Sequence, residues 1–469
     1  MDYKEKSEKL LANILIIGLG TILTKLISFI MTPFYARWLS VEDYGTYDLI
    51  ATYVSLCVPL TTLQLDQAIY RFSMEQPNES NAVYRSVIKI TLPLFLGVPV
   101  IIIAIMNSLK FDLITTISFI CYFVFLGLYN LNSEYLRGNN RLREYSFCNI
   151  LVGVTTVLFS YLLVRRLAFK VPGMLASFAI AYGVAMAFIL FRFKPYVKQT
   201  TKSYYTPKQL LSYSVPLIPN SISWWITNVS DRTIINIFHG SFSNGIYAIS
   251  CKVPTILSLV FSIFNLSFQQ VAIQSNSDKD INEYYSQLMK KTITLLFTGS
   301  SVIVASTPFL YKFFLNKDYW SGLNCVPILL GGAIMLSLAQ YVGDILLAEK
   351  KTKAIGISTV AGACLNIILN FVLIPEFDVV GASFATLMSY ILMFFFRIIK
   401  IKNKLNVKIL LERFSKYCCL FITISLSVVL YKSNFLMSIV IFIISALVFL
   451  AANFEIIRST VQSVSRRLK

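Results

Sequence analysis

The chain has 469 residues, of which 56% are hydrophobic and 14% charged, and its formal net charge is +19. Apolar stretches recur along its whole length, far more than one soluble core requires, so the composition excludes a soluble globular protein and predicts an all-α polytopic membrane protein. The eight cysteines are scattered without CxxC or metal-ligand spacing, and His239 is the only histidine. A disulfide framework or a metal centre is therefore not expected.

Stretches of about 20 apolar residues, the length that a helix needs to cross the hydrocarbon core, predict fourteen transmembrane helices. No loop between them exceeds about 20 residues, which leaves no room for a soluble catalytic domain. In chain order the predicted spans are 11–35, 46–70, 87–108, 113–136, 146–164, 172–191, 210–238, 245–272, 292–314, 322–347, 355–375, 379–399, 412–431 and 434–456.

The distribution of positive charge predicts the orientation in the membrane. When alternate loops are assigned to opposite sides, 31 of the 42 lysines and arginines fall on the side of the N-terminus and 8 on the other side. The positive-inside rule therefore predicts that both termini are cytoplasmic. Since this arrangement accounts for the net charge, no nucleic-acid partner is expected. One basic cluster, RRLAFK at 165–170, falls on the predicted outer side.

Short motifs recur at a nearly constant offset. EDYGTYDLI at 42–50 and FSNGIYAIS at 242–250 share a Gly-x-Tyr, and VPGMLASFAIAY and VVGASFATLMSY share a glycine, Gly173 in the first and Gly381 in the second. The pattern predicts two related six-helix bundles, 1–200 and 201–405, followed by two additional transmembrane helices and a cytoplasmic tail at 406–469. Repeated halves are typical of transporters that work by alternating access.

Polar residues at steps of three and four line one face of each of four predicted helices. Such a face, several turns long, cannot contact lipid, so we expect these faces to border one cavity shared by the two halves. The alternative is that their hydroxyl and amide groups only hold helices together. The stripes are Thr21, Lys25, Ser28, Thr32; Asp48, Thr52, Ser55, Pro59, Thr62, Asp66; Asn220, Trp224, Thr227, Asp231; and Thr255, Ser258, Ser262, Asn265, Gln269.

Buried charge marks candidate functional residues, because a charged side chain at the centre of a span costs roughly 2.5–3.5 kcal/mol. Lys25, Arg232 and Lys252 lie within predicted spans, and cations in a cavity suit an anionic substrate. Asp231 adjoins Arg232 at about 100° around a helix, so the two do not share a face. Asp231 either orients the arginine or pairs with Arg232 or Lys252 to hold two helices together.

Acidic residues are concentrated near the predicted cytoplasmic ends of the spans. Asp66, Glu134 and Asp344 are the candidates, and each could bind H⁺ or Na⁺ as a coupling ion. No other cofactor is expected.

Three segments resemble the Wzx-type polysaccharide flippases, the O-antigen and capsule repeat-unit translocases of the multidrug/oligosaccharidyl-lipid/polysaccharide exporter superfamily. They are SVPLIPNSISWWITNVSDRTIINIFHGSFSNGIYAISCKV, LNIILNFVLIPEFDVVGASFATLMSY and TPFYARWLSVEDYGTYDLI. The resemblance implies two six-helix bundles around a central cavity. It also implies transfer of undecaprenyl-diphosphate-linked oligosaccharides from the cytoplasmic to the outer leaflet of the bacterial plasma membrane.

The same resemblance implies roles for particular residues and partners. The cationic cavity of the family corresponds to Lys25, Arg232 and Lys252, with Asp231 in the Asp-Arg signature, and Arg37 in the first-loop motif is a further substrate-binding candidate. Membrane lipids, a polysaccharide polymerase and a chain-length regulator are the expected partners besides the substrate.

Three other functions fit parts of the pattern. An ion-coupled multidrug or metabolite antiporter of the same superfamily would favour cationic substrates and use buried carboxylates such as Asp66 and Asp344. A membrane polysaccharide polymerase is less well supported, since the sequence has no nucleophile–histidine pair, metal-ligand cluster or phosphate-binding glycine loop. A scaffold would not need buried charge. The sequence therefore predicts a flippase and not an enzyme.

Overall fold

The computed structural model describes residues 23–458, except 25, 196–204, 275–280, 350, 403, 404, 406, 456 and 457. Over these residues the protein is all-α and contains no strand, which confirms the predicted fold class. Ten helices in this part are long and apolar enough to cross a bilayer, or eleven if the bent pair α2–α3 counts as one span. Most of the first predicted span lies outside the described residues, and two of the described helices contain a break.

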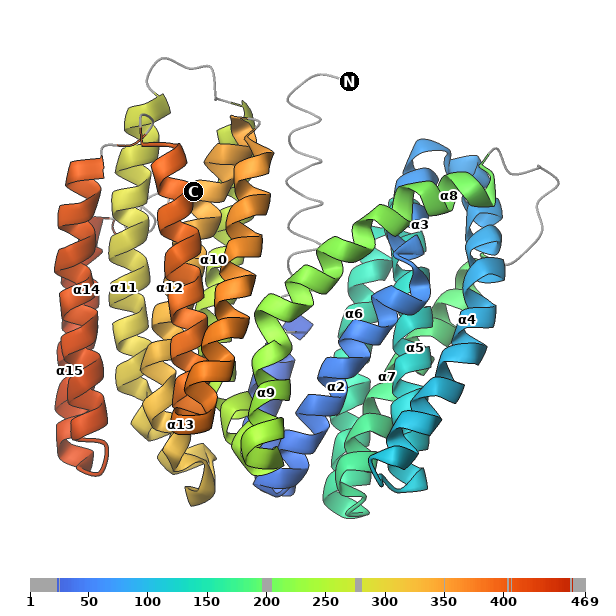
Figure 1. Ribbon diagram of the computed structural model, residues 1–469, viewed down its shortest axis with the longest axis horizontal. Helices are drawn as coiled ribbons and strands as arrows, with labels where there is room; N and C mark the ends of the chain where they lie inside the picture. The colour runs from blue at the N-terminus through green and yellow to red at the C-terminus, as the bar shows by residue number, and fades with distance from the viewer. Residues whose placement is uncertain are drawn as a thin grey trace, which may run out of the picture. The chain divides into compact units, whose positions relative to one another are not determined.

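The chain divides into two compact units, residues 1–229 and 230–469 (Figure 1). Within the first unit, α2 to α7 form an apolar core around α5, and α8 packs against α3 and α4. Its helices are α2 (Val41–Thr62), α3 (Leu65–Glu75), the short η1 (Pro77–Glu79), α4 (Ser80–Ser108), α5 (Leu113–Gly138), α6 (Leu142–Ser160), the π-helical η2 (Tyr161–Arg166), α7 (Lys170–Phe193), α8 (Pro207–Ser214) and η3 (Val215–Leu217).

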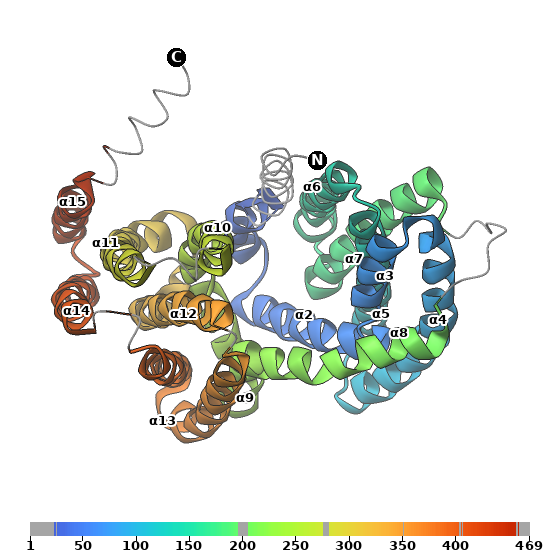
Figure 2. The same ribbon diagram turned by 90° about the horizontal axis from the view of Figure 1, so that it is seen from above.

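The second unit begins inside α9 (Ile218–Ser250). Helix α12 packs against α10, α11 and α13, and the last two helices pack against α11, as the end-on view shows (Figure 2). The other helices are α10 (Lys252–Gln274), α11 (Ile281–Phe314), η4 (Lys317–Asn324), α12 (Cys325–Ala348), α13 (Thr352–Lys400), α14 (Val407–Leu430) and α15 (Phe435–Ala452).

Two predicted spans of the first unit are interrupted. The span 46–70 ends at Thr62 and restarts at Leu65 with a 53° bend, because Leu63 and Gln64 adopt left-handed φ angles of 52° and 56°. Non-glycine residues rarely adopt this conformation. The prediction of one continuous helix over 46–70 is therefore wrong, because the break at Leu63 and Gln64 divides it. The span 210–238 is divided by the 3₁₀ turn Val215–Leu217, since a proline cannot donate the helical hydrogen bond.

The second unit contains two breaks that face one another. Gly240 in α9 has φ 79°, which favours glycine, and Asp378 in α13 has φ 49°. The His239 ring lies 2.8 Å from the carbonyl oxygen of Ile374, and the Ser243 hydroxyl donates to Asp378 Oδ2 at 2.8 Å. Side chains beside each break therefore contact the other helix. The break in α13 separates the predicted spans 355–375 and 379–399.

The repeated glycines Gly173 and Gly381 each allow close contact with a backbone carbonyl group. A Cβ at Gly173 would lie 3.1 Å from the carbonyl oxygen of Leu163, and a Cβ at Gly381 would overlap that of Leu373. Each glycine thus lets the start of one helix approach the end of the preceding helix. The division into related bundles at 1–200 and 201–405 stays a prediction.

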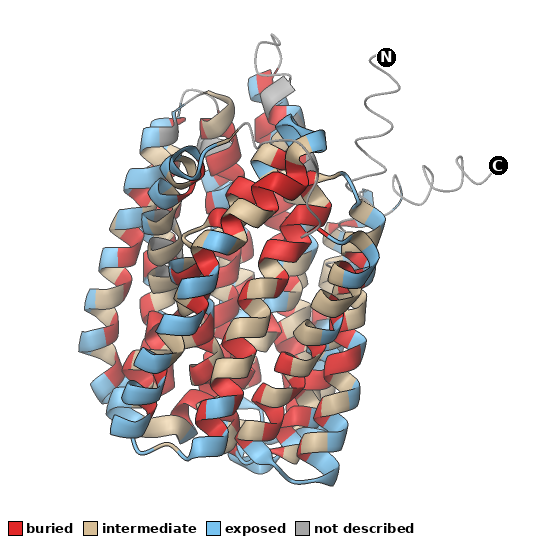
Figure 3. Cartoon of the chain, turned by 90° about the vertical axis from the view of Figure 1, so that its right-hand side faces the viewer, coloured by how far each residue is buried: buried red, intermediate tan, exposed pale blue. Residues whose placement is uncertain are grey.

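Exposed residues occur along the length of helices and not only at their ends (Figure 3). Large apolar side chains are among them. Leu96 and Val100 on α4 are exposed, as are Leu436 and Leu447 on α15. In water such surfaces would promote aggregation, whereas in a bilayer they contact acyl chains.

The close approach at Gly381 predicts that Gly381→Ala destabilises the protein by about 1–3 kcal/mol, because the new methyl group would press on backbone rather than on a flexible side chain. Thermal unfolding of the detergent-solubilised chain measures the effect. Gly356→Ala, on the same helix with open space at its Cβ position, is the matched control and should leave the midpoint unchanged or slightly higher. Equal midpoints for both variants would contradict this account.

Candidate functional site

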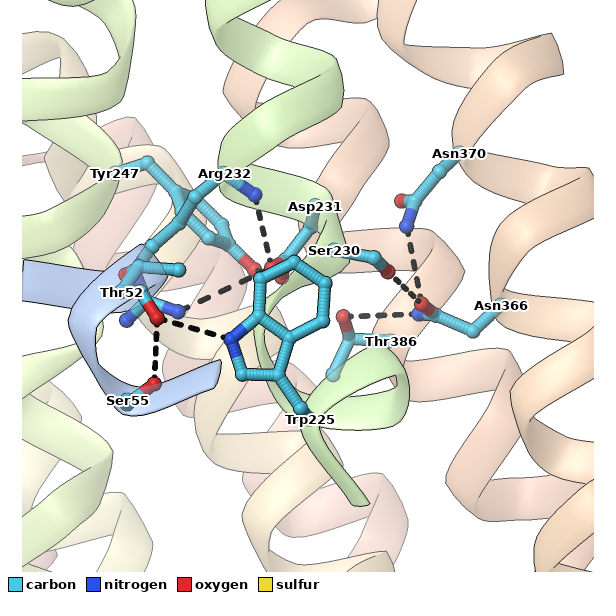
Figure 4. A network of polar contacts seen from close by, with 10 residues as sticks. All are labelled: Thr52, Ser55, Trp225, Ser230, Asp231, Arg232, Tyr247, Asn366, Asn370 and Thr386. Atoms are coloured by element: carbon cyan, nitrogen blue, oxygen red, sulfur yellow. Dashed lines mark hydrogen bonds and ion pairs between the residues drawn. The ribbon is translucent and has the colours of Figure 1, made fainter. Parts of the chain in front are cut away.

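The Asp-Arg pair lies near the middle of α9, and a tyrosine from the end of the same helix meets it (Figure 4). Asp231 Oδ1 accepts a hydrogen bond from the backbone N–H of Arg232 at 3.0 Å and lies 4.0 Å from its Nη1. Asp231 Oδ2 accepts a short hydrogen bond from the Tyr247 hydroxyl. The Arg232 guanidinium also lies 6.0 Å from the centre of the Tyr247 ring. The carboxylate therefore holds both the arginine and the Gly-x-Tyr motif.

This geometry brings Asp231 and Arg232 into contact, and the two roles that the sequence left open for Asp231 stay predictions. Adjacent residues point about 100° apart on a helix, yet the long arginine side chain bends back towards its neighbour. Asp231 interacts with Arg232 and Tyr247, and the side chains of Asp231 and Arg232 are 7% and 16% exposed. Burial of both charges in an apolar helix is costly unless they interact with each other and form hydrogen bonds.

A second polar network joins α9 to α13 in the same unit (Figure 4). Asn366 Oδ1 accepts hydrogen bonds from Ser230 Oγ at 3.4 Å and Asn370 Nδ2 at 3.0 Å, and Asn366 Nδ2 donates to Thr386 Oγ1 at 3.4 Å. Asn370 Oδ1 has no hydrogen-bond partner among the described residues. Sequence analysis did not select these residues, although two asparagines four positions apart in an apolar helix are a detectable signal.

Asp344 on α12 is 6% exposed and meets the polar stripe of α10. Its Oδ1 accepts a hydrogen bond from Gln269 Nε2 at 2.9 Å, so two residues that the sequence selected separately lie together. Asp344 Oδ2 and Asn265 Oδ1 have no hydrogen-bond partner in the described part of the chain. These oxygens have lone pairs available for a proton or a cation.

Arg397 on α13 is a buried charged residue that is not among the candidates predicted from the sequence. Its charge counts among those of the predicted cytoplasmic side, at the end of the predicted span 379–399, but it is 5% exposed. Its guanidinium donates to Ser358 Oγ at 2.9 Å, to the carbonyl oxygen of Ala339 at 2.8 Å and to Thr359 Oγ1 at 3.0 Å. A Cβ at Gly343 would lie 2.8 Å from Nη1, so that glycine leaves room for the guanidinium. Arg397 therefore joins both halves of α13 to α12.

In the first unit Asp66 begins α3 directly after the break in the helix. Its Oδ2 accepts a hydrogen bond from Gln67 Nε2 at 2.9 Å, and its Oδ1 has no hydrogen-bond partner among the described residues. Two cavities of about 290 and 320 Å³ share Asp66 and Asn130. The first is also bordered by Ser55, Pro59 and Thr62, so part of the predicted stripe of this span lines a cavity.

Glu134 borders the second of these cavities, but it already has a charged partner. Arg137 Nη1 lies 2.7 and 2.8 Å from the two carboxylate oxygens of Glu134, and its guanidinium lies 4.5 Å from the centre of the Tyr70 ring. The three carboxylate candidates thus differ: Glu134 is neutralised by arginine, whereas Asp66 and Asp344 interact with amide groups.

A tryptophan hydrogen-bonds to the middle of α2, the helix that carries the stripe from Asp48 to Thr62 (Figure 4). Trp225 Nε1 donates to the carbonyl oxygen of Thr52 at 3.0 Å, and Ser55 Oγ donates to the same oxygen at 2.6 Å. Trp225 also borders the cavity of about 290 Å³. Sequence analysis did not single out this residue.

The remaining substrate-binding candidates are placed as follows. Lys252 is half-buried and is the first residue of α10, inside the stretch Val229–Ser262 that is long and apolar enough to cross a membrane. Arg37 is exposed near the end of the helix at 26–38. Lys25, Thr21 and the side chains of Asn220, Trp224 and Thr227 lie outside the described part of the chain. In that part, no three histidine, cysteine or acidic side chains are grouped to hold a metal ion.

Comparison with known sequences gives a family. The model of a family described as polysaccharide biosynthesis protein matches residues 10–273, more than half of the chain. The probable low-salt glycan biosynthesis flippase Agl15 of Haloferax volcanii is 25% identical over 406 residues, which cover 83% of this chain and 81% of that protein. An uncharacterized membrane protein of Methanocaldococcus jannaschii is 23% identical over 439 residues, covering 85% and 84%.

Solved structures share the fold at low sequence identity. The lipid II flippase MurJ, in an inward closed conformation, gives a TM-score of 0.72 at 16% identity, covering 95% of this chain and 100% of that chain. An inward-facing multidrug resistance MATE transporter of the MOP superfamily gives 0.65 at 12% identity, covering 83% and 98%. The named relative and both structures carry the names of flippases or transporters.

The three hydrogen bonds of Arg397 predict that Arg397→Ala lowers the free energy of unfolding by about 2–4 kcal/mol, because it removes the donor from three oxygens on two helices. Arg397→Lys should recover only part of this loss, since an ammonium group cannot reproduce the planar guanidinium geometry. Denaturant unfolding in detergent measures both variants. Arg458→Ala, at an exposed position, should change stability by less than about 0.5 kcal/mol, and an equally small effect of Arg397→Ala would refute the prediction.

Proposed function

We propose a flippase function for this chain, which belongs to the polysaccharide biosynthesis protein family. It moves oligosaccharide repeat units linked to undecaprenyl diphosphate from the cytoplasmic to the outer leaflet of the plasma membrane, for assembly into O-antigen, capsule or exopolysaccharide. The observation that carries the proposal is the buried Arg232, fixed by Asp231 and Tyr247 inside an apolar helix. The printed name of the Haloferax relative, a glycan biosynthesis flippase, supports the same class of substrate.

The proposed role of Arg232 is to attract the diphosphate or an acidic sugar of the substrate. A guanidinium presents five N–H donors in a plane and matches phosphate oxygens in pairs. Asp231 and Tyr247 orient this group. Lys25, Lys252 and Arg37 are the further cations that we propose for substrate binding.

The proposed mechanism is alternating access by two related bundles, 1–200 and 201–405, with 406–469 as an addition. The equivalent glycines Gly173 and Gly381 support the relationship between the bundles. The breaks at Gly240 and Asp378 supply turns about which the two parts of α9 and the two parts of α13 could move during the cycle. The proposed orientation is the one predicted by the positive-inside rule, with both termini in the cytoplasm. A polysaccharide polymerase with its chain-length regulator would receive the translocated repeat units.

The proposed coupling ion is H⁺ or Na⁺, and Asp66 and Asp344 are better placed to bind it than Glu134. Asp66 Oδ1 and Asp344 Oδ2 have no hydrogen-bond partner in the described residues, whereas both oxygens of Glu134 contact Arg137. A carboxylate oxygen without a donor can accept a proton or ligate a hard cation.

One observation favours a second candidate, an ion-coupled multidrug or metabolite antiporter. Asp66 borders two cavities of about 290 and 320 Å³, and a carboxylate in a cavity suits a cationic substrate. The family match and the buried arginine favour the flippase instead.

We expect Arg232→Ala to reduce transport by about tenfold or more, because loss of one charge-assisted contact to phosphate costs at least about 1.4 kcal/mol. Arg232→Lys should have intermediate activity. Surface polysaccharide in cells that carry each variant, normalised to the amount of protein in the membrane, gives the measurement. Arg143→Ala, an exposed arginine, is the matched control and should behave as wild type. Loss of protein in proportion to loss of polysaccharide would support a purely structural role.

Deletion of the gene tests the function as a whole. The flippase account expects surface polysaccharide to disappear and complete lipid-linked repeat units to accumulate on the cytoplasmic leaflet, measured by extraction and by enzymatic access from each side. Repeat units that reach the outer leaflet without polymerisation would point to a polymerase. Unchanged polysaccharide would leave the antiporter.

A further inference from the structure

We propose that one end of the helices α11, α14 and α15 forms a binding site for the phosphate head group of an anionic phospholipid. A cavity of about 360 Å³ lies there, and Lys290, Lys291 and Arg413 border it. These three helices carry none of the charged groups discussed above, so the site belongs to a different part of the second unit.

The cavity arises from the spacing of residues on α11 and from small residues on α15. Gln287, Lys290, Lys291 and Thr294 follow one another at steps of three, one and three, so they share one face of α11. Thr294 is buried, and its hydroxyl donates to the carbonyl oxygen of Lys290 at 3.0 Å. Opposite this face, α15 ends in two alanines at 451 and 452, whose short side chains leave the space open.

The ends of the helices are fixed in this arrangement by a buried hydrogen bond. Asn453 Nδ2, one residue beyond the end of α15, donates to Thr298 Oγ1 on α11 at 3.0 Å. Packing of Phe297 against Phe414 joins α11 to α14 with ring centres 5.3 Å apart. The cavity is therefore a preformed feature and not a chance gap between surface side chains.

The charge of the cavity is strongly positive. Lys290, Lys291 and Arg413 are present with a single carboxylate, Glu455, and none of the three cations forms an ion pair with any residue that the structure describes. The Arg413 guanidinium lies 5.6 Å from the centre of the Tyr417 ring. Its N–H edges suit phosphate oxygens.

The depth of the cavity matches the plane of the lipid phosphates. On α11, Lys291 and Lys312 are separated by a rise of about 32 Å, which is close to the thickness of the hydrocarbon core of about 30 Å. On the neighbouring α14, Arg413 and the last residue, Leu430, are about 26 Å apart on the same basis. Lys291 and Arg413 therefore each lie about one hydrocarbon thickness from the far end of their helix.

The surroundings favour a lipid over a free ion. Leu411 on α14, Leu450 on α15 and Phe454 just beyond α15 are exposed, and each lies within two residues of a lining residue in the sequence, so acyl chains attached to a bound head group have apolar surface to contact. The cations also lie on the side that the positive-inside rule predicts to be cytoplasmic, where anionic lipids are enriched. Basic pockets between transmembrane helices at this interface are a known way of binding such head groups.

Native mass spectrometry of the full-length purified protein, titrated with phosphatidylglycerol and with phosphatidylethanolamine of the same acyl chains, tests the proposal. Wild type should bind phosphatidylglycerol more tightly than phosphatidylethanolamine. The triple variant Lys290→Gln, Lys291→Gln, Arg413→Gln should lose at least about tenfold in affinity for phosphatidylglycerol only, because each cation near a charged lipid contributes favourably. The matched control Lys312→Gln, Lys432→Gln removes cations from the other ends of the same helices and should behave as wild type.

Three results would overturn the proposal: equal affinity of wild type for the two lipids, unchanged selectivity in the triple variant, or the same loss in the control variant. Displacement of phosphatidylglycerol by an equal concentration of inorganic phosphate would also overturn it, since the ligand would then be a free anion. Thermal unfolding establishes that each variant is folded. If the triple variant does not fold, the charge-conserving Lys290→Arg, Lys291→Arg, Arg413→Lys variant should keep the selectivity, and its loss would equally refute the site.

Discussion

Polar groups inside a bilayer must find their partners within the protein, because the hydrocarbon core offers none. This constraint explains why the buried charges of the chain are surrounded by donors and acceptors from other helical segments. Asp231 holds Arg232 and Tyr247, and Arg397 donates to oxygens on two helices. Where the backbone itself departs from helix, at Asp378, a serine from a neighbouring helix hydrogen-bonds the side chain at the break. The same constraint makes each buried charge informative about function.

Much of the fold could be predicted from the sequence, because the length of each apolar stretch indicates a transmembrane helix and the distribution of lysine and arginine between loops indicates orientation. The breaks were harder to predict. Gly240 and the prolines before α9 are recognisable interruptions, whereas Leu63 and Gln64 adopt left-handed φ without any glycine or proline to signal it. There the conformation depends on packing of α2 and α3 against α5, which one sequence does not encode locally.

Some residues of the candidate site could be predicted from the sequence, and others depend on tertiary packing. Asp231 and Arg232 stand out because charge is rare in an apolar run, and Gln269 with Asp344 follows from helical spacing and from acidic residues near span ends. Arg397 was missed because a charged residue at the predicted end of a span is normally a loop residue. Only the tertiary structure shows that it turns inward, into the room left by the absence of a side chain at Gly343.

The most direct test of the central claim is translocation by the purified chain alone. Full-length protein in liposomes, with a fluorescent oligosaccharide on a short-chain polyprenyl diphosphate in the inner leaflet, would be assayed for the fraction of label that an external quencher reaches over time. If the chain is a flippase, the external quencher should reach the label faster than in protein-free liposomes, and the chemical structure of the lipid should not change. Exposure at the protein-free rate, under H⁺ and Na⁺ gradients of either direction, would contradict the account.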